Sequence, residues 1–404
     1  LMQCYVAYKL KDLSNFGNFS GTGAGKTLSA ILVSQVIGSK LTLIVCPNDV
    51  VDHWEKRIHE SFPKARVITG KDVFSAVYDD SKFQFLVLNY DKLNQADSSN
   101  NIIKLVKQKL DLVILDEIHF SKITSSKQIG IRRQNLDGLM SAARKKNKDI
   151  RVLGMSATPV VNNLTEGKSL LELITGYRYD DVSTKPTIPN AVTLFEKLTM
   201  LAIRQIPKYR NPDKQYAEVS IDIPSHKDLL ELHKKPMAIE QVLTDARIPE
   251  IIKRIHGQTV IYTEYLGSAF KDEPNILEKL KKAVNDAGFT FGLYVGEDHS
   301  GLDKFLKRQV QVLIASRPIS TGVDGLQTVC SNLIFNTLPW TYALYQQIIG
   351  RIVRTGQGAS LVKIHHIIAS IGGYPYDQTK LDRLKYKRTL AECAVEGLLP
   401  EKNL

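Results

Sequence analysis

Short apolar runs alternate with longer amphipathic stretches in the first part of this chain. The runs predict strands at Leu41–Cys46, Phe85–Leu88, Leu112–Leu115 and Arg151–Gly154. Runs without polar alternation are typical of strands buried on both faces, as in a parallel sheet whose connections are helices. The region from Gly21 to about Leu173 is therefore predicted to be an α/β domain.

The same pattern returns in the second part of the chain. There it predicts strands at Thr259–Tyr262, Phe291–Val295, Val312–Ala315, Leu333–Phe335 and Lys363–Ile367. The stretch from Asp180 to Pro249 is richer in Pro, Lys and Tyr, with helical patterns at Ala191–Arg204 and His226–His233. We expect an α/β domain over residues 1–180, a helical insertion or linker over 181–250, and a second α/β domain over 251–404.

Composition supports two soluble domains and suggests a polyanionic partner. A chain of 404 residues exceeds one ordinary core, and its 43% apolar and 24% charged residues are typical of globular proteins. The net charge of +12 favours nucleic acid as a partner, although solvated lysines alone give the same balance. The sequence shows neither a membrane-spanning run nor a secretory pattern, so we expect a cytoplasmic, nucleoid or nuclear protein. The start at Leu1 suggests a fragment.

The four cysteines give no sign of a structural metal site. Their positions are scattered without metal-ligand spacing, which predicts reduced core residues and no structural zinc. They are Cys4, Cys46, Cys330 and Cys393.

The run Phe19-Ser20-Gly21-Thr22-Gly23-Ala24-Gly25-Lys26-Thr27 has the composition of a phosphate-binding loop. Gly21, Gly23 and Gly25 let the backbone aim its N–H groups at phosphates, and the following helix lends its positive end. Lys26 is predicted to neutralise the β- and γ-phosphates, and the Thr27 hydroxyl to coordinate Mg²⁺. Ser20 stands where the simplest form of the motif has glycine, and a glycine-rich turn before a helix is the alternative.

Two carboxylates follow the predicted strand Leu112–Leu115, in the run Asp116-Glu117-Ile118-His119. Ligands bind at the carboxyl ends of strands in open α/β sheets. Asp116 is predicted to hold Mg²⁺ through water, and Glu117 to orient and deprotonate the water that attacks the γ-phosphate. In isolation, a helix cap would be the preferred interpretation of this tetrapeptide. His119 is predicted to sense the γ-phosphate or to couple this motif to the next one, with a simple hydrogen-bonding role as the alternative.

These motifs, in this order, resemble helicase superfamily two, and most closely its Swi/Snf-type double-stranded DNA translocases. The resemblance implies two RecA-like domains of the P-loop NTPase type, each a parallel sheet flanked by helices. Leu43–Asn48, followed by Trp54 and Glu55, resembles motif Ia, which implies DNA-phosphate contacts by Pro47 and Asn48. Leu86–Tyr90 resembles motif Ib, with Asn89 as a further contact.

Gly154–Pro159 resembles the coupling motif of the superfamily. The resemblance implies that Ser156 and Thr158 exchange hydrogen-bond partners as the nucleotide site opens and closes. Asn162–Leu164 and Leu170–Leu171 resemble the Swi/Snf extension of that motif.

The second half carries two more resemblances. Ser316–Asp324 resembles motif V, implying phosphate contacts by Ser320, Thr321 and Gly322 and communication with the nucleotide by Asp324. Gln347, Arg351 and Arg354 resemble motif VI, with Gln347 in a coupling role. The two arginines are predicted to share one helix face and to act as arginine fingers. Asp324 and Gly350 follow the wider superfamily whereas Trp340 follows the Swi/Snf branch, so the chain is a divergent member.

Several single positions leave alternatives open. Gln3 is compatible with adenine recognition, or with an ordinary solvated side chain. Lys122 is predicted to contact a DNA phosphate or to be solvated, and the run Arg144–Lys148 favours a solvated loop. The segment Leu201–Arg204 resembles the helical protrusion of Swi/Snf motors. Aromatic residues typical of single-strand binding are not obvious, which mildly favours duplex DNA.

The leading hypothesis is a monomeric ATP- and Mg²⁺-dependent motor that moves along double-stranded DNA or remodels protein–DNA complexes. A strand-separating helicase acting on DNA or RNA is the nearest rival. A catalytically inert nucleic-acid-binding or scaffold subunit of a larger complex is the alternative from another class.

Overall fold

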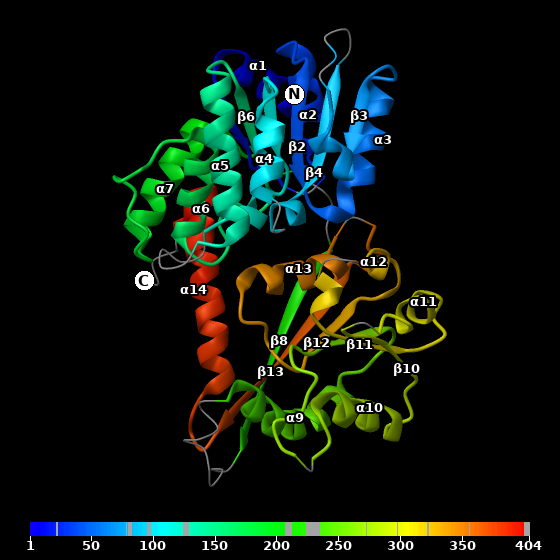
Figure 1. Ribbon diagram of the computed structural model, residues 1–404. Helices are drawn as coiled ribbons and strands as arrows, with labels where there is room; N and C mark the ends of the chain where they lie inside the picture. The colour runs from blue at the N-terminus through cyan, green and yellow to red at the C-terminus, as the bar shows by residue number, and fades with distance from the viewer. Residues whose placement is uncertain are drawn as a thin grey trace. The chain divides into compact units, whose positions relative to one another are not determined.

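The computed structural model shows two compact units along the chain (Figure 1). It describes residues 1–21, 23–77, 79, 83–94, 98–123, 129–206, 212–223, 235–271, 273–296, 298–320, 323–354 and 356–399. The first unit comprises Leu1–Lys208 and Lys387–Leu404, and the second comprises Tyr209–Tyr386. Among the described helices, none combines the length and apolarity that crossing a membrane requires.

The first unit is built on a seven-stranded parallel sheet with the order β3-β4-β2-β5-β6-β1-β7. Its strands are β1 (Asn15–Asn18), β2 (Leu41–Cys46), β3 (Arg66–Thr69), β4 (Gln84–Asn89), β5 (Leu112–Leu115), β6 (Arg151–Met155) and β7 (Ala202–Ile203). The four strands predicted in this part are confirmed as β2, β4, β5 and β6. The other three are short, and the apolar pattern did not distinguish them from loops.

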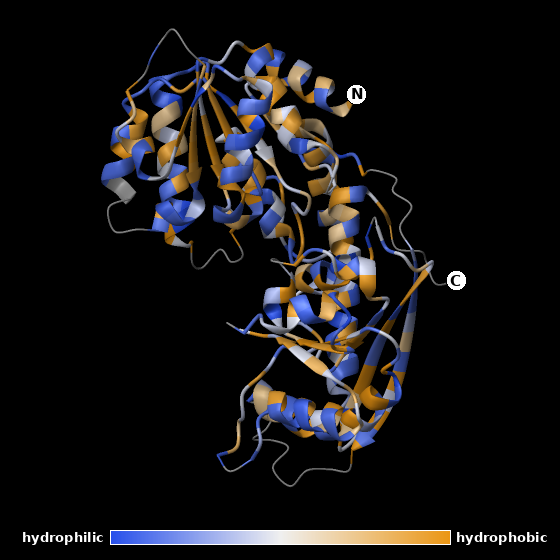
Figure 2. Ribbon diagram, turned by 90° about the vertical axis from the view of Figure 1, so that its right-hand side faces the viewer, coloured by the Kyte–Doolittle hydropathy of each residue, from blue (hydrophilic) through white to orange (hydrophobic). Residues whose placement is uncertain are grey.

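Apolar cores cover both faces of this sheet. Along β2, Leu43 and Val45 belong to one core, whereas Ile44 and Cys46 belong to the other. Successive side chains of a strand point to opposite faces, so an unbroken apolar run is what a doubly covered strand needs. Figure 2 shows these strands in orange between helices with blue polar residues. The helices are α1 (Met2–Asp12), α2 (Lys26–Val36), α3 (Val51–Ser61), α4 (Ser98–Val106), α5 (Ile131–Lys146), α6 (Leu164–Thr175) and α7 (Ile188–Leu201).

The second unit has a six-stranded parallel sheet with the order β10-β11-β9-β12-β13-β8. Its strands are β8 (Asp213–Ile223), β9 (Thr259–Tyr262), β10 (Phe291–Tyr294), β11 (Val312–Ala315), β12 (Asn332–Phe335) and β13 (Leu361–Ile371). Its helices are α9 (Pro236–Lys253), α10 (Ile276–Asp286), α11 (Gly301–Leu306), α12 (Leu326–Val329), α13 (Tyr342–Ile352) and the start of α14 (Tyr376–Glu396). All five predicted strands are confirmed, although β13 runs further at both ends.

The segment 181–250 differs from the expected helical insertion, because the two units share it. Helix α7 packs Ala191, Leu194 and Leu198 into a core of the first unit. Strand β8 pairs with β13 along all 11 of its residues, and its alternating polar and apolar side chains suit an edge strand. The helix predicted at His226–His233 lies outside the described residues. The end of the chain also differs, since α14 places Leu390 in a core of the first unit.

A buried ionic network joins α9 to the start of α14 in the second unit. The Arg247 guanidinium donates to Glu240 Oε2 at 2.8 Å and to Asp377 Oδ2 at 2.6 Å. Lys380 Nζ donates to the other Glu240 oxygen at 3.0 Å, and lies 4.3 Å from the centre of the Trp340 ring. All four charged side chains are at most 4% exposed. Each charge is therefore compensated by an opposite one, as burial requires.

The neighbouring buried histidines of β13 predict an acid-sensitive second unit. Burial, followed by nearby cationic groups, lowers the pKa of both His365 and His366 from 6.5 to about 4. The unfolded chain therefore binds protons that the folded unit excludes, so stability is complete above pH 6.5 and falls as the pH drops towards about 4. Each histidine contributes a slope of about 1.4 kcal/mol per pH unit in that window.

The variant His366→Phe tests this prediction, because the ring lies among Tyr216, Phe335 and Tyr345. Urea unfolding over this pH window should show a shallower loss of stability in the variant than in the parent. Carboxylates titrate in both proteins and cancel in the comparison. Equal slopes would contradict the assignment.

Candidate functional site

The phosphate loop joins β1 to α2 at the carboxyl edge of the first sheet. Gly23 and Gly25 adopt left-handed backbone conformations with φ of 76° and 81°, which glycine reaches without steric cost. Helix α2 begins at Lys26, whose Nζ donates to the carbonyls of Ser20 at 3.1 Å and Gly21 at 3.3 Å. Burial lowers the pKa of Lys26, against the nearby charges of Glu117 and Asp116. The loop thus gathers a cation and a helix N-terminus at one point.

Side chains from two other elements brace the loop. Gln3, on α1, donates from Nε2 to the Ala24 carbonyl at 3.0 Å, and a Cβ at Gly25 would lie only 2.6 Å from the same nitrogen. The structure therefore brings Gln3 to the loop, while its predicted contact with adenine stays a prediction. Asn18, at the end of β1, donates to Ser29 Oγ at 2.9 Å and accepts from the Ser20 amide at 3.3 Å. Sequence reasoning did not single out Asn18.

Asp116 follows β5 at the same edge and is only 9% exposed. Its Oδ2 accepts from Trp54 Nε1 at 2.8 Å, and its Oδ1 accepts from the Glu117 amide at 3.0 Å. Burial and then the neighbouring Glu117 charge raise the pKa of Asp116 to about 6, while the Trp54 bond and the Lys26 charge act in the opposite direction. The carboxylate is held in position, but the Lys26 charge and the Trp54 bond offset only part of the cost of burying its negative charge.

Glu117, His119 and Ser156 form a linked group that extends to the coupling motif. Glu117 has a left-handed backbone with φ of 45°, an uncommon conformation for a residue with a Cβ. His119 Nδ1 lies 3.1 Å from Glu117 Oε2 and 2.9 Å from Ser156 Oγ, which also accepts from the Thr158 amide at 3.1 Å. Burial disfavours ionisation of Glu117, but the His119 hydrogen bond and the His119 and Lys26 charges outweigh it and lower its pKa. The structure therefore connects His119, Ser156 and Thr158, three of the predicted coupling residues, to Glu117.

The donor set fits a hydrated divalent cation beside a nucleotide. Asp116 and Glu117 share one edge of the sheet with Lys26, and His119 Nδ1 lies 3.1 Å from Glu117 Oε2. Hard oxygen ligands of this kind suit Mg²⁺, which usually keeps several waters and uses one or two carboxylates. Asp116 and Thr27 are the side chains that would hold it.

Arg204 ties the start of the phosphate loop to the coupling motif. Its guanidinium donates to the carbonyls of Phe19 and Ala157, the latter at 3.2 Å, and pairs with Glu396 near the end of α14. The next residue, Gln205, donates its amide to Ser20 Oγ at 3.1 Å. The expectation of a helical protrusion around Arg204 is wrong, because this residue follows β7 beside the phosphate loop.

Motifs Ia and Ib lie on neighbouring strands at the same edge. Pro47 and Asn48 follow β2, and Asn89 ends β4. Asn89 Nδ2 donates to Asn48 Oδ1 at 2.6 Å, so the two motifs are directly bonded. Tyr90, immediately after Asn89, donates its hydroxyl to the Asp116 carbonyl at 2.9 Å. Contact of these residues with nucleic acid stays a prediction.

Arg351 and Arg354 occupy different surroundings within the second unit. Arg351, on α13, donates to the carbonyls of Ser320 at 3.0 Å and Val323 at 3.1 Å, which anchors it to motif V. Arg354 lies 3.2 Å from Asp324 Oδ1, and its side chain is 37% exposed. The expectation that both share one helix face is wrong, because α13 ends at Ile352. Gln347 lies half-buried on α13, whereas Thr321 and Gly322 lie outside the described residues.

Two family models match the parts of the chain that carry these motifs. Residues 18–161 match "Type III restriction enzyme, res subunit", and residues 241–356 match "Helicase conserved C-terminal domain". Together the two segments span more than half of the 404 residues. The chain belongs to helicase superfamily two.

Relatives of this chain come from viruses, bacteria and plants. "Nucleoside triphosphatase I" of Choristoneura fumiferana entomopoxvirus is 28% identical over 41% of this chain and 25% of the relative. The "Uncharacterized ATP-dependent helicase YqhH" of Bacillus subtilis is 23% identical over 83% of this chain and 69% of the relative. "Protein CHROMATIN REMODELING 19" of Arabidopsis thaliana is 28% identical over 38% of this chain and 21% of the relative. The chain thus spans about a quarter of the viral relative.

A solved structure supports the same fold for this chain. "DUF1998 helicase MrfA bound to DNA and AMPPNP" aligns over 96% of this chain and 50% of that chain, with a TM-score of 0.51 and 16% identity. At this identity the likeness concerns the fold alone. Each of the two parallel sheets, flanked by helices, corresponds to a RecA-like domain.

Lys122 is held within the first unit by a buried partner. Its Nζ lies 3.0 Å from Glu166 Oε1, and the side chain of Glu166 is fully buried. Glu166 Oε2 accepts from the amides of Val161 and Asn162 at 2.9 and 3.0 Å. This arrangement favours a role for Lys122 in joining the acidic motif to the coupling motif, and its contact with a phosphate stays a prediction. The Asn163 cap, three residues before Glu166, was the sequence signal for this cluster.

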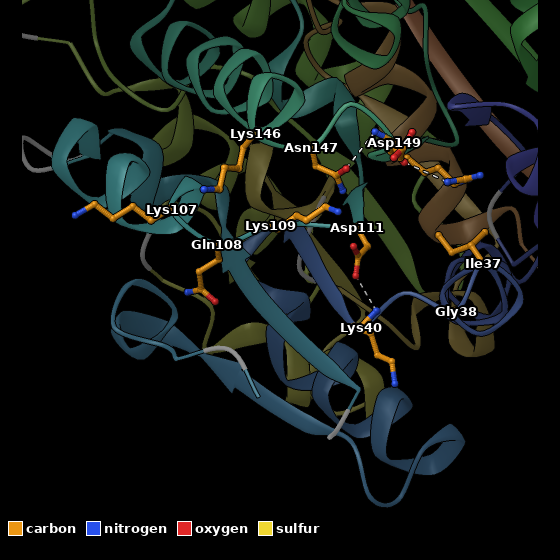
Figure 3. A pocket seen from close by; sticks show the side chains of 11 residues that line it. Ile37, Gly38, Lys40, Lys107, Gln108, Lys109, Asp111, Lys146, Asn147 and Asp149 are labelled. Atoms are coloured by element: carbon orange, nitrogen blue, oxygen red, sulfur yellow. Dashed lines mark hydrogen bonds between the residues drawn. The ribbon is translucent and has the colours of Figure 1, made fainter. Parts of the chain in front are cut away.

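One cavity of the first unit with several cationic residues lies away from these motifs. A cavity of about 750 Å³ opens at the amino-terminal ends of β2, β5 and β6 (Figure 3). It is lined by Lys40, Lys107, Lys109, Lys146, Arg151, Asp111 and Asp149 together with neutral residues. Arg151 and Asp111 are committed to backbone groups of Leu10 and Lys40. Its acidic residues, Asp111 and Asp149, precede β5 and β6, whereas Asp116 and the phosphate loop lie at the opposite edge of the sheet.

Proposed function

We propose that this chain is a nucleic-acid-stimulated ATPase that moves along double-stranded DNA in the manner of Swi/Snf-type translocases. The observation that carries the proposal is the group at the carboxyl edge of the first sheet. Lys26, Asp116 and Glu117 lie there together, and His119 links Glu117 to the coupling motif. Each is the residue type that ATP hydrolysis requires at that place.

The loop amides and Lys26 would hold the triphosphate, with Thr27 and Asp116 directed to the metal. A bound Mg²⁺ would neutralise charge on the phosphate oxygens. Glu117 is ionised at neutral pH because its pKa is lowered, so it can orient a water and accept its proton at a carboxylate oxygen. Of Arg351 and Arg354, we propose Arg354 as the residue that stabilises charge on the transferred phosphoryl group. Arg351, anchored on motif V carbonyls, would position that segment.

Double-stranded DNA is the proposed track. The net charge of +12 supports a polyanionic partner, and the relatives include a protein named for chromatin remodelling. Asn48 and Asn89 present amide groups at the sheet edge that suit phosphate contacts. Cycles of ATP binding and hydrolysis would then alternate the grip on one strand.

Steady-state ATP hydrolysis tests the proposal when it is measured with no nucleic acid, duplex DNA, single-stranded DNA and RNA. We expect strong stimulation by duplex DNA in the parent and none in Lys26→Ala. Arg354→Ala should lower the stimulated rate by about 10³-fold or more, the effect typical of an arginine finger. Arg383→Ala, which removes an exposed arginine of α14, is the matched control and should retain the parent rate.

The other outcomes separate the rival functions. Stimulation chiefly by single strands or RNA would replace the translocase by a strand-separating helicase. An absence of hydrolysis under all four conditions, together with failure to bind a labelled ATP analogue with Mg²⁺, would favour an inert nucleic-acid-binding or scaffold subunit. A duplex-stimulated enzyme should also displace the third strand of a triplex, which reports translocation directly.

A further inference from the structure

Two buried aromatic side chains fix Asp116 from opposite ends of the residue. Trp54 donates from Nε1 to the carboxylate at 2.8 Å, and Tyr90 donates its hydroxyl to the backbone carbonyl at 2.9 Å. Both aromatic residues are 1% exposed. A buried donor has no competing water, so each bond is directional and costly to leave unmade. We therefore expect the position of Asp116 to change when either ring is displaced.

Both aromatic residues belong to the segments predicted to hold nucleic acid. Trp54 lies in the first turns of α3, directly after the short helix Asn48–Val50 of motif Ia. Tyr90 is the residue after Asn89 of motif Ib. Asn48 and Asn89 are themselves joined by a bond of 2.6 Å, so a ligand that moves one must move or break its contact with the other. In each segment, one aromatic side chain is therefore hydrogen-bonded directly to Asp116.

The strand order places these segments next to one another. Strand β2 lies between β4 and β5, and Asp116 donates its amide to the Val45 carbonyl at the end of β2. Three neighbouring strand ends therefore carry motif Ia, motif Ib and the acidic motif. Since parallel strands present their carboxyl ends at one edge, a polyanion gripping the first two lies beside the third.

We propose that Trp54 and Tyr90 are positioning residues that transmit nucleic-acid binding at Asn48 and Asn89 to the metal-holding carboxylate of Asp116. The inference rests on the proposed ATPase function. It assigns the stimulation of that ATPase, within the first unit, to two hydrogen bonds. Neither aromatic residue touches the reacting atoms.

Single-atom changes test the two bonds. Trp54→Phe removes the indole N–H, and Tyr90→Phe removes only the hydroxyl. The chain offers matched controls in its second unit. Trp340 Nε1 donates to Tyr265 Oη at 2.7 Å, and the Tyr345 hydroxyl lies 3.1 Å from His366 Nε2, so Trp340→Phe and Tyr345→Phe remove similar bonds far from Asp116 in the sequence. All four proteins would be checked for thermal unfolding first.

The first readout is the Mg²⁺ dependence of binding of a fluorescent ATP analogue. Trp54→Phe should raise the half-saturating Mg²⁺ concentration about tenfold, because a bond to a charged group is lost. The second readout is ATP hydrolysis at increasing duplex DNA. Both variants should lower the maximal stimulated rate at least about fivefold and leave the half-saturating DNA concentration within about twofold of the parent, which separates positioning from DNA affinity.

The third readout is tryptophan fluorescence, which is easily assigned because the chain has only 2 tryptophans. In the Trp340→Phe protein, Trp54 is the sole indole, and its emission should change on addition of duplex DNA without nucleotide. An unchanged emission would overturn the proposed transmission. So would Trp54→Phe and Tyr90→Phe matching their controls in both Mg²⁺ dependence and maximal rate, or a loss of rate explained by thermal instability alone.

Failure of the proposed transmission through Trp54 and Tyr90 can be distinguished from failure of the proposed ATPase function. If the parent hydrolyses ATP without any stimulation by nucleic acid, the transmission is excluded while the ATPase stands. If the parent does not hydrolyse ATP at all, the Mg²⁺ dependence of analogue binding still decides whether Trp54 positions Asp116.

Discussion

Glu117→Gln is expected to lower the duplex-stimulated rate of ATP hydrolysis by at least about a hundredfold, the lower range for a positioned general base. The amide keeps the size of the side chain but cannot accept a proton from water. Its neighbours His119 and Lys26 hold the carboxylate ionised in the parent, which makes the charge itself the lost feature. Binding of Mg²⁺ with an ATP analogue should persist, because Lys26 and Asp116 remain. Single-turnover hydrolysis measures the effect without product release.

The matched control for this variant is Glu60→Gln. Glu60 pairs with Arg57 on the exposed side of α3, where water can replace the lost contact, so its neutralisation should leave the rate unchanged. A Glu117→Gln protein that retains more than about a tenth of the parent rate would remove Glu117 from its assigned role. Loss of analogue binding in the variant would instead indicate a role in holding the nucleotide.

Arg247→Met should destabilise the second unit by about 3–5 kcal/mol, which is the usual cost of breaking a buried ion pair on one side. Methionine occupies a similar length but leaves Asp377 without its cation and Glu240 with Lys380 alone. Burial already raises the pKa of Asp377, and Arg247 is the main group that opposes this shift. Urea unfolding at neutral pH measures the change in stability. The unfolding is monitored by the fluorescence emission of Trp340, whose ring packs against Lys380.

Arg254→Met is the matched control, because it applies the same substitution at the end of the same helix. Arg254 pairs with Glu250, where both side chains are 22% exposed, and water can replace the lost contact. The unfolding midpoint should therefore move little. Equal effects of the two substitutions would show that the buried network adds nothing to stability.

Local patterns predicted nine strands of the two sheets and the motifs of the first unit. Unbroken apolar runs identified strands such as β5, since doubly buried strands have no polar face. The phosphate loop and the Asp116–Glu117 pair were also readable, because each motif is contiguous and its spacing carries the mechanism. Strand β8 was not predicted. Its alternating side chains suit an edge strand, but only its pairing with β13 identifies it as one.

Motif resemblance did not predict the surroundings of individual basic residues. From the sequence, Lys122 was predicted to contact a DNA phosphate or to be solvated. Arg204 was predicted to lie in a helical protrusion, and Arg351 to contact the nucleotide. The structure shows them bound to Glu166, to Glu396 with two carbonyls, and to motif V carbonyls, respectively. Arginine and lysine carry only donors, so any available acceptor satisfies them. Sequence alone does not say which acceptor lies near.

The sequence by itself determined that this protein has two parallel α/β units and one phosphate loop with an acidic pair. These features depend on residues close together in the chain, where periodicity and spacing are visible. Only the tertiary structure decided the division of residues 181–250 between the units, the Trp54 bond to Asp116 and the pairing of Arg204 with Glu396. Such contacts join residues 62 to 192 positions apart. Folding creates them by bringing strand ends and helices together, and no local pattern in the sequence records which partners meet.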